Sequence, residues 1–402
     1  MVSIASHQFC NSGATAPEKI TSLSQIMKKP SQQANILVVG AGFAGSVCAR
    51  ELADAGYKVQ MIDRRSHMGG NAWDTYDEKG FLIHPYGPHI FHTNSRQVMA
   101  WLSRFTEWRF YEHKVLAHAK GEYFPIPINR TTLNQVFKKN LTEAEVPEFL
   151  ESIREPRSPI KSSEDVVLNS VGPQLCDMFF RGYTQKQWGL DLSELSAGVA
   201  ARIPVRTNDD DRYFADDYQF MPAKGYGAMF EKMLNHPNIE LTLGQNFEPY
   251  QIDSAIRHTI YTGPIDAFFN YKFGKLPYRS LRFEHFHETD VAESENAQVA
   301  PVVNYPMDHA YTRITEFKQL TGQTKAGSSL VKEFPTSEGD PYYPIPRPEN
   351  DALFQRYSEA AEALKNVSFV GRLAQYRYYN MDQVVAAALK KASNIKELLK
   401  AH

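Results

Sequence analysis

The sequence predicts an α/β fold in which a parallel sheet carries an inserted helical domain and an antiparallel β-sheet domain. Three observations support this class. Residues 36–39 are apolar and end at a glycine, as a buried parallel strand does. Residues 131–180 have a helical pattern that prolines interrupt. Residues 281–305 alternate polar and apolar side chains, which is typical of edge strands in an antiparallel sheet.

A glycine-rich turn follows the first strand. Gly40, Gly42 and Gly45 have the G-x-G-x-x-G spacing, in which the glycines permit a tight turn, close approach of a pyrophosphate and packing of helix on strand. A helical stretch follows, and a second strand at 59–63 ends at Asp63, where an acid binds a ribose hydroxyl pair. The anion would lie on the free N–H groups at the helix N-terminus. This order predicts a Rossmann-like unit rather than a glycine turn in an ordinary βαβ unit.

The residues after the acid distinguish flavin from nicotinamide. Arg64 and Arg65 precede the run Gly69–Gly70–Asn71, so cations and bare backbone come close to a second face of the pyrophosphate. A solvated basic turn is the alternative interpretation. The run resembles the glutathione-reductase-like flavoproteins, and this resemblance implies FAD as the cofactor.

Composition narrows the class of protein. The 402 residues suffice for two or three domains, and 42% hydrophobic with 22% charged residues is typical of a globular protein. The net charge of −2 gives no reason to expect nucleic acid or an anionic membrane as a partner. No apolar run reaches about 18 residues, so no membrane span is predicted. The scattered Cys10, Cys48 and Cys176 suit a reducing compartment, and we expect a cytoplasmic protein.

The chain is expected to divide into a tail and three domains. Residues 1–34 are rich in Ser, Ala, Thr and Gln and are interpreted as a flexible N-terminal tail. The domains are a discontinuous FAD-binding domain at 35–97, 223–271 and 357–402, a helical domain with a mobile lid at 130–199, and an antiparallel sheet domain at 98–129, 200–222 and 272–356.

Other elements follow from local patterns. Helices are predicted at 96–104, 224–234 and 381–400, a hairpin at 111–125, and strands at 239–243, 259–263 and 367–371. The last helix is expected to be capped by Asn380 or Asp382. The dense charge at 206–214 requires solvent or an anionic ligand.

Two stretches carry candidate site residues. His89 and His92 lie on turns broken by Gly and Pro, and no carboxylate has metal-ligand spacing to them, so a loop against the flavin is preferred to a metal site. Residues 179–190 crowd aromatic and polar side chains between Gly182 and Gly189, which would permit hinging. The interleaved polar residues argue against a simple aromatic core patch.

Five motifs together resemble the bacterial-type UDP-galactopyranose mutases. They occur in the family's order over residues 36–389: GPHIFHT at 87–93, YTQKQWG at 183–189, RIPVR at 202–206, YTR at 311–313 and YRYYNMD at 376–382. The resemblance implies an isomerase that interconverts UDP-galactopyranose and UDP-galactofuranose. In the implied mechanism, N5 of reduced FAD attacks the anomeric carbon and displaces UDP, a flavin–sugar iminium forms, the ring recloses and UDP returns.

The sequence agrees with that chemistry in one respect. It has no obvious Ser–His–Asp or Cys–His set and no metal cluster, so the cofactor must supply the nucleophile. The resemblance further implies NADH or NADPH as the reductant, a homodimer or higher homo-oligomer, and supply of galactofuranose for cell-wall polysaccharide.

The resemblance also implies the site residues. Arg202 and Arg313 would bind the diphosphate, because the planar guanidinium pairs two phosphate oxygens at once, and His92 completes the catalytic set. The alternative is that both arginines are surface residues. The substrate-binding set adds Phe179, Tyr183, Thr184, Trp188, Asn304, Tyr343 and Tyr378. The cofactor-binding set comprises Gly40, Gly42, Phe43, Ala44, Asp63, Arg64, Gly70, Asn71, His89, Arg372, Tyr379, Asn380 and Met381, and the metal set is empty.

One departure and two rival functions remain open at this point. Family members often have an aspartate where this chain has Asn380, so a charge is lost while hydrogen bonding is kept. The rivals are a flavin oxidase or dehydrogenase of the amine-oxidase-like type, and a non-catalytic flavin-dependent redox sensor. Net turnover of an oxidisable substrate would indicate the first, and FAD binding without a nucleotide-sugar site would indicate the second.

Overall fold

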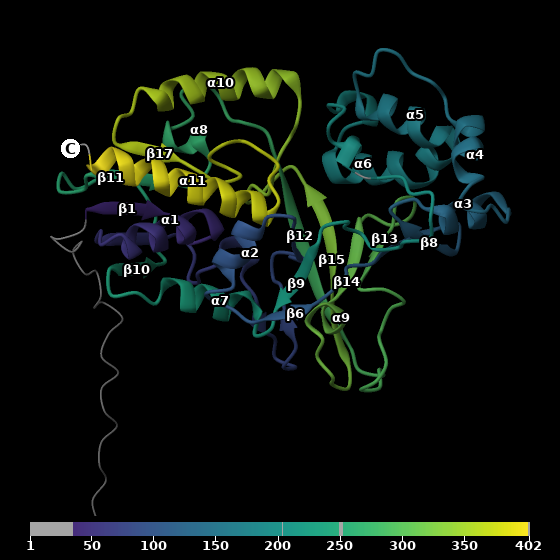
Figure 1. Cartoon of the computed structure of the whole chain (residues 1–402), viewed down its shortest axis with the longest axis horizontal. Helices are drawn as coiled ribbons and strands as arrows, with labels where there is room; N and C mark the ends of the chain where they lie inside the picture. Colours follow the sequence, from purple (N-terminus) through teal and green to yellow (C-terminus); the bar gives the residue numbers. More distant parts are fainter. Residues whose placement is uncertain (1–34, 203, 249–251, 401–402) are drawn as a thin grey trace, which may run out of the picture.

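The computed structural model describes residues 35–400 except 203 and 249–251 (Figure 1). The predicted tail at 1–34, with Cys10, lies outside the described residues. A parallel sheet forms one end of the molecule, with strand order β10-β2-β1-β11-β17. The strands are β10 (Ile239–Leu243), β2 (Val59–Asp63), β1 (Ile36–Val39), β11 (His258–Tyr261) and β17 (Val367–Phe369). The α/β class with a Rossmann-like unit is therefore confirmed, and the predicted strands are placed within two residues.

Helices cover this sheet. The first helix, α1 (Phe43–Asp54), packs along the C-terminal helix α11 (Met381–Lys400), and α7 (Gly225–Leu234) contacts α1 as well. Their buried faces share one core with β1 and β2, because the apolar side chains at 3.6-residue spacing face the apolar strands. In Figure 1, α10 (Pro348–Glu362) and α8 (Ile265–Phe268) lie above this layer.

A buried carboxylate begins α7. Asp74 accepts hydrogen bonds from the backbone N–H groups of Tyr226 at 2.6 Å and Gly227 at 2.7 Å. A Cβ on Gly225 would stand 2.6 Å from the same carboxylate. The glycines before and within the first turn are therefore required by the approach of Asp74, which satisfies otherwise unpaired N–H groups.

The second sheet is long and mixed. Its strand order is β16-β12-β15-β14-β13-β7-β8, and every pair is antiparallel except the parallel pair β13–β7. The strands are β16 (Tyr343–Pro344), β12 (Tyr278–Glu288), β15 (Ser328–Thr336), β14 (Arg313–Glu316), β13 (Val302–Asn304), β7 (Val115–Ala119) and β8 (Glu122–Ile126). The expectation that 281–305 forms edge strands holds for 281–288, which pairs with β15 alone among the described strands, because β16 reaches only Tyr278 and Arg279 of β12. The expectation is wrong for β13, which β14 and β7 flank.

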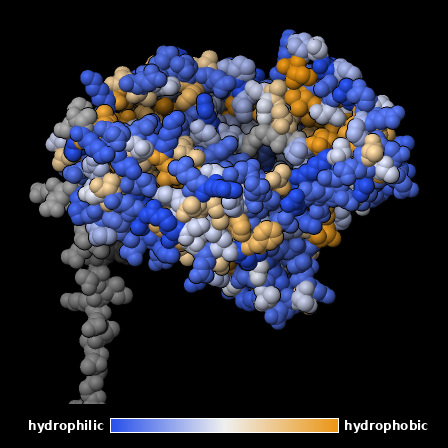
Figure 2. All heavy atoms as spheres, in the orientation of Figure 1, coloured by the Kyte–Doolittle hydropathy of each residue, from blue (hydrophilic) through white to orange (hydrophobic). Residues whose placement is uncertain are grey.

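A helical region packs beside β7 and β8 (Figure 1, right). It comprises α3 (Arg130–Phe137), α4 (Val146–Ile153), α5 (Ser163–Leu175), the π-helix η2 (Cys176–Arg181), α6 (Gly182–Trp188) and the 3-10 helices η3 (Leu192–Glu194) and η4 (Ala200–Arg202). Hydrophobic side chains gather over this region in Figure 2. The predicted lid segment forms η2 and α6. A π-turn in this position is typical of functional segments.

Short elements connect these layers. Strands β5 (Phe91–Thr93), β9 (Tyr218–Pro222) and β6 (Trp108–Phe110) form a small antiparallel sheet, β3 (Thr75–Tyr76) pairs with β4 (Leu82–Ile83), and α2 (Arg96–Leu102), α9 (Phe317–Thr321) and the 3-10 helix η1 (Gly70–Ala72) complete the described elements. Along the described ranges, none of the helices combines the length and apolar character needed to cross a bilayer.

Candidate active site

Two backbone turns meet at the carboxyl ends of β1 and β2. Gly40 has φ +103°, and a Cβ there would collide with the Thr262 hydroxyl. A Cβ on Gly70 would stand 3.0 Å from the Gly42 Cα. Within the described chain, Gly42 caps α1 without any side-chain hydrogen bond, so the first N–H groups of the helix are left for an anion. The bare backbone of both turns thus fits the pyrophosphate of a dinucleotide, and Phe43 and Ala44 open the helix at this point.

Asp63 ties this turn to the next one. One carboxylate oxygen accepts the Ala41 N–H at 2.7 Å and the other accepts the Arg65 N–H at 2.8 Å. Arg65 also donates to Asn71 at 2.8 Å. Each carboxylate oxygen keeps a further lone pair that can accept from a ribose hydroxyl. Arg64 lies at the same turn, and its described partner is Asp340, at 2.7 Å.

A second group surrounds the start of α11. Arg372 donates to the backbone carbonyl of Tyr379 at 2.6 Å. Burial lowers the pKa of His89 to about 4, and the charge of Arg372 contributes, so His89 is neutral at pH 7. Thr93 donates its hydroxyl proton to Asp382 at 2.9 Å, which joins β5 to the first turn of α11. His89, Arg372, Tyr379, Asn380 and Met381 therefore lie around the start of α11, where helix N–H groups favour negative charge.

An aromatic cavity lies between the helical region and the long sheet. The predicted substrate residues Phe179, Tyr183, Thr184, Trp188 and Asn304 all line it. Its remaining walls are mostly apolar, from β7, β8 and η4. The side-chain oxygen of Asn304 is buried and has no hydrogen-bond partner among the described residues, so it offers an acceptor to a ligand.

Three aromatic rings connect this cavity to the cofactor side. The ring of Trp188 lies 6.3 Å from that of Tyr343 and 5.9 Å from that of Tyr378, between centroids. The guanidinium of Arg372 lies 5.3 Å from the Tyr343 ring and 5.6 Å from the Tyr378 ring. The predicted substrate residues and the predicted cofactor residue Arg372 are thus continuous in space.

Arg313 faces a buried acid. It stands directly opposite Glu333 in the β14–β15 ladder, with Nε 3.3 Å from Oε1. Burial opposes the charge of Arg313, but the Glu333 carboxylate and the neighbouring tyrosines together raise the pKa of the guanidinium. The Arg313 side chain remains a quarter exposed, whereas Glu333 is buried. Arg313 is therefore a fixed cation with a free edge, and Tyr183 and Tyr343 are among its electrostatic neighbours.

His92 is held by residues that were not predicted as site residues. Its Nδ1 lies 2.8 Å from the Asp216 carboxylate, and its ring stacks on Phe214 with centroids 3.6 Å apart. Phe214 also stacks on His113, whose pKa burial lowers to about 3, with Arg313 contributing. In sequence these partners are far from His92, and their only signal was the aromatic and acidic composition of 213–217.

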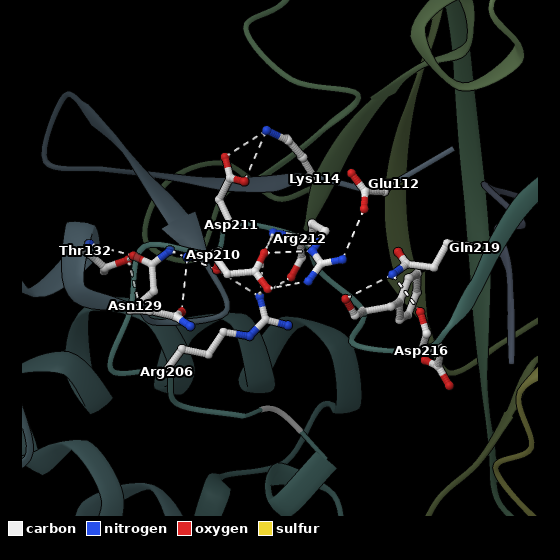
Figure 3. Close-up of polar contacts among 12 residues, drawn as sticks. Glu112, Lys114, Asn129, Thr132, Arg206, Asp210, Asp211, Arg212, Asp216 and Gln219 are labelled. Atoms are coloured by element: carbon white, nitrogen blue, oxygen red, sulfur yellow. Dashed lines mark hydrogen bonds and ion pairs between the residues drawn. The ribbon is translucent and has the colours of Figure 1, made fainter. Parts of the chain in front are cut away.

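The charged segment before Phe214 pairs with itself and its neighbours (Figure 3). Arg212 forms two hydrogen bonds of 2.9 Å with Asp210 and one of 3.1 Å with Glu112. Arg206 donates to the backbone carbonyls of Asp210 and Arg212. These contacts brace the loop that carries Tyr213 to the cavity, so the segment has partners within the protein. The Asp209, Asp211 and Arg212 side chains are also exposed, as the predicted need for solvent requires.

The predicted catalytic residue Arg202 ends η4, but its side chain lies outside what the structure describes. Tyr213 was not predicted, yet it lines the cavity and packs edge-on against His113. Over the described ranges, no three His, Cys, Asp or Glu side chains are grouped to hold a metal ion.

Comparisons with known proteins agree with this geometry. The family model for UDP-galactopyranose mutase matches residues 178–378, and that for an NAD(P)-binding Rossmann-like domain matches residues 38–105. A probable UDP-galactopyranose mutase of Klebsiella pneumoniae is 42% identical over 369 residues, covering 89% of this chain and 94% of that protein. A dTDP-fucopyranose mutase of Escherichia coli is 39% identical over 373 residues, covering 89% and 97%. A crystal structure of reduced UDP-galactopyranose mutase has a TM-score of 0.72 at 18% identity, over 91% of this chain and 94% of that one.

The close contact between the two glycine turns predicts that a side chain at Gly70 would weaken binding of the flavin. Gly70→Ala puts a Cβ against Gly42, in the space through which a pyrophosphate approaches, so we expect it to lower the flavin content of the purified protein. The flavin content is measured as the ratio of absorbance at 450 nm to that at 280 nm, which is on the order of a tenth in a flavoprotein of this size. Gly56→Ala is the matched control, since Gly56 also has positive φ but has open space around it. Equal flavin content in the two variants would contradict the assignment.

Proposed function

The chain belongs to the UDP-galactopyranose mutase family of isomerases, and from this premise we propose that it interconverts UDP-galactopyranose and UDP-galactofuranose without net redox change. The main support for the proposal is that three features adjoin one another: the aromatic cavity, the cation Arg313, and the Tyr343 and Tyr378 rings beside Arg372. A nucleotide sugar needs three such surfaces next to one another, because its base stacks on aromatic rings, its diphosphate binds cations and its sugar meets the cofactor.

FAD fits the residues present, since the two glycine turns, Asp63 and the start of α11 supply bare backbone, a ribose acceptor and helix N–H groups. When bound and reduced, this cofactor supplies a nucleophilic nitrogen toward the anomeric carbon. The N–H groups at the start of α11 favour negative charge on the ring system that they face.

Arg313 stabilises the departing nucleotide. The diphosphate gains negative charge as the glycosidic bond breaks, and a prearranged cation lowers the energy of that state. The Glu333 carboxylate, 3.3 Å from Nε, compensates the burial of the guanidinium, and the exposed quarter of the side chain can pair with phosphate oxygens. By the family resemblance, Arg202 supplies the second guanidinium.

The cavity residues bind and orient the substrate. Phe179 and Tyr183 flank the base, and the Asn304 and Thr184 side chains offer polar contacts in an otherwise apolar wall. Trp188, Tyr343 and Tyr378 enclose the sugar and exclude water from the reacting carbon. The Asp216 carboxylate can accept a hydrogen bond donated from Nδ1 of His92, and this contact orients the imidazole ring.

We propose finer properties on the same basis. NADH or NADPH reduces the flavin, and the chain acts in the cytoplasm as a homodimer or higher homo-oligomer. Its product supplies cell-wall polysaccharide. The domain boundaries and the mobile lid predicted from the sequence belong to this proposal as well.

Turnover of the furanose isomer tests the function directly. Protein reduced with dithionite is expected to convert UDP-galactofuranose to UDP-galactopyranose, followed by chromatography, while oxidised protein is the control. A parallel arm with dTDP-fucofuranose tests the substrate of the Escherichia coli relative. Conversion by the oxidised protein at the same rate would overturn the proposal, and exclusive turnover of the dTDP-sugar would move it to that substrate. Consumption of oxygen with net oxidation of a substrate would favour the oxidase rival.

The role of Arg313 predicts a large kinetic effect. Arg313→Ala is expected to lower kcat by about a hundredfold, on the scale of a lost donor to developing charge. Arg313→Lys keeps a cation but not the planar fork, so it is expected to retain more activity than the alanine variant. Arg282→Ala is the control, because Arg282 is an exposed arginine on β12. Normal kcat in Arg313→Ala, with full flavin content, would remove this residue from the diphosphate site.

The Asp216–His92 contact makes a separate prediction. Asp216→Ala releases Nδ1 of His92, so kcat is expected to fall by about tenfold or more, a part of what an acid–base residue contributes. KM should change little, since the contact does not touch the cavity that binds the base. The matched control is Asp217→Ala, the exposed neighbouring acid. If both variants keep the wild-type kcat, His92 has no part in proton transfer.

A further inference from the structure

The helix that carries Trp188 into the site is held at its end by a residue from another layer. Helix α6 ends at Trp188 and is followed by Gly189 with φ +68°. Arg279, on β12, donates from Nε to the Gln187 carbonyl at 2.9 Å and from Nη2 to the Lys186 carbonyl at 3.1 Å. A Cβ on Gly189 would stand 3.2 Å from Nη1. The guanidinium therefore occupies the C-terminal end of α6.

Arg279 is unusual for a buried arginine. It is 8% exposed, and no carboxylate pairs with it among the described residues. Burial lowers the pKa of its guanidinium. Burying a cation without a counter-charge costs free energy, so other groups must stabilise Arg279 at this position. The carbonyls at the end of α6 do so, because they carry the negative end of the helix dipole and accept hydrogen bonds that the helix itself leaves unmade.

The backbone of Arg279 holds the opposite wall of the site. Arg279 pairs with Tyr343 in the β12–β16 ladder, and its carbonyl accepts the Tyr342 N–H at 2.9 Å. The Tyr343 ring lies 6.3 Å from the Trp188 ring. One residue thus binds the end of α6 with its side chain and the strand of Tyr343 with its backbone, so it sets the spacing between these two aromatic rings.

The other polar contacts of α6 lead to a different part of the fold. Lys186 donates from Nζ to the Tyr305 carbonyl at 2.6 Å and the Asp308 carbonyl at 2.7 Å. A Cβ on Gly182 would collide with the Pro306 carbonyl oxygen. These contacts attach the helix to the turn between β13 and β14. The hydrogen bonds of Arg279 instead join the last residues of α6 to the strand that pairs with Tyr343.

We propose that Arg279 is a positioning residue that holds Trp188 against Tyr343 and thereby sets the affinity of the cavity for the nucleotide sugar. The proposal rests on the proposed function, since it assigns the cavity to a nucleotide sugar. Its physical content is that two charge-assisted hydrogen bonds keep α6 in the geometry that the bound substrate needs. Without them, substrate binding must first order the end of α6, which weakens binding.

The test compares Arg279→Met, which keeps the length of the side chain, with Arg279→Lys, which keeps the charge. Arg282→Met, an exposed arginine on the same strand, is the matched control. We expect Arg279→Met to raise KM and the calorimetric Kd for UDP by about tenfold, the size expected for losing charge-assisted hydrogen bonds, with a smaller change in kcat. Arg279→Lys should lie between wild type and Arg279→Met, and the control should match wild type.

Three outcomes separate the hypotheses. Failure of the wild-type holoenzyme to bind UDP would sink the proposed function. Wild-type binding of UDP with an unchanged Kd and KM in Arg279→Met would overturn the role of Arg279. If Arg279→Met does not fold or loses its flavin, hydrogen exchange of residues 182–189 in Arg279→Lys decides. Faster exchange there at full flavin content supports the proposal, and unchanged exchange with unchanged KM overturns it.

Discussion

The close approach of two glycine turns is the constraint on which the cofactor half of the molecule depends. Gly42 and Gly70 come so near that a side chain on either would fill the space between them. That approach requires β1 and β2 to end side by side, which the parallel register provides, and Asp63 fixes it by accepting N–H groups from both turns. The start of α11 is brought to the same end of the sheet through Thr93 and Asp382. The same contacts therefore stabilise the fold and shape the cofactor site.

The positive charge of the substrate half comes from individual side chains and not from the net charge of the protein. With a net charge of −2, the chain has no general attraction for a diphosphate, so a fixed cation must be built where it is needed. Pairing Arg313 with Glu333 inside a sheet achieves this, because the acid balances the charge of the buried guanidinium while a quarter of the side chain stays exposed. The departure at Asn380 concerns a side-chain charge and not the backbone contacts that start α11. Its N–H and C=O both take part in starting α11, and Asp382 keeps one carboxylate in that first turn.

The sequence predicted what is determined locally. The glycine spacing, the acid at Asp63 and the apolar strands give the parallel sheet, because each depends on neighbours within one βαβ unit. The substrate residues were predicted through family resemblance, and the fold brings Phe179, Tyr183 and Trp188 together around one cavity, while substrate binding there stays a prediction. Pairs made across the fold were missed. Nothing near His92 in sequence indicates Asp216, and the charges at 206–212 had no visible partners until the chain brought Glu112 beside them. The interior position of β13 likewise depends on β7, a strand far away in the sequence.

The cofactor half and the substrate half of the site are connected by the same few side chains. Arg372 contacts the start of α11 through the Tyr379 carbonyl and lies over Tyr343 and Tyr378, which in turn meet Trp188. Arg279 then joins Trp188 and Tyr343 from behind. A displacement at the end of α6 must therefore be taken up by rings that also contact the cofactor side, since packed rings leave little space to move separately. For a reaction in which cofactor and sugar must meet at one carbon, such continuity is what fixes their distance.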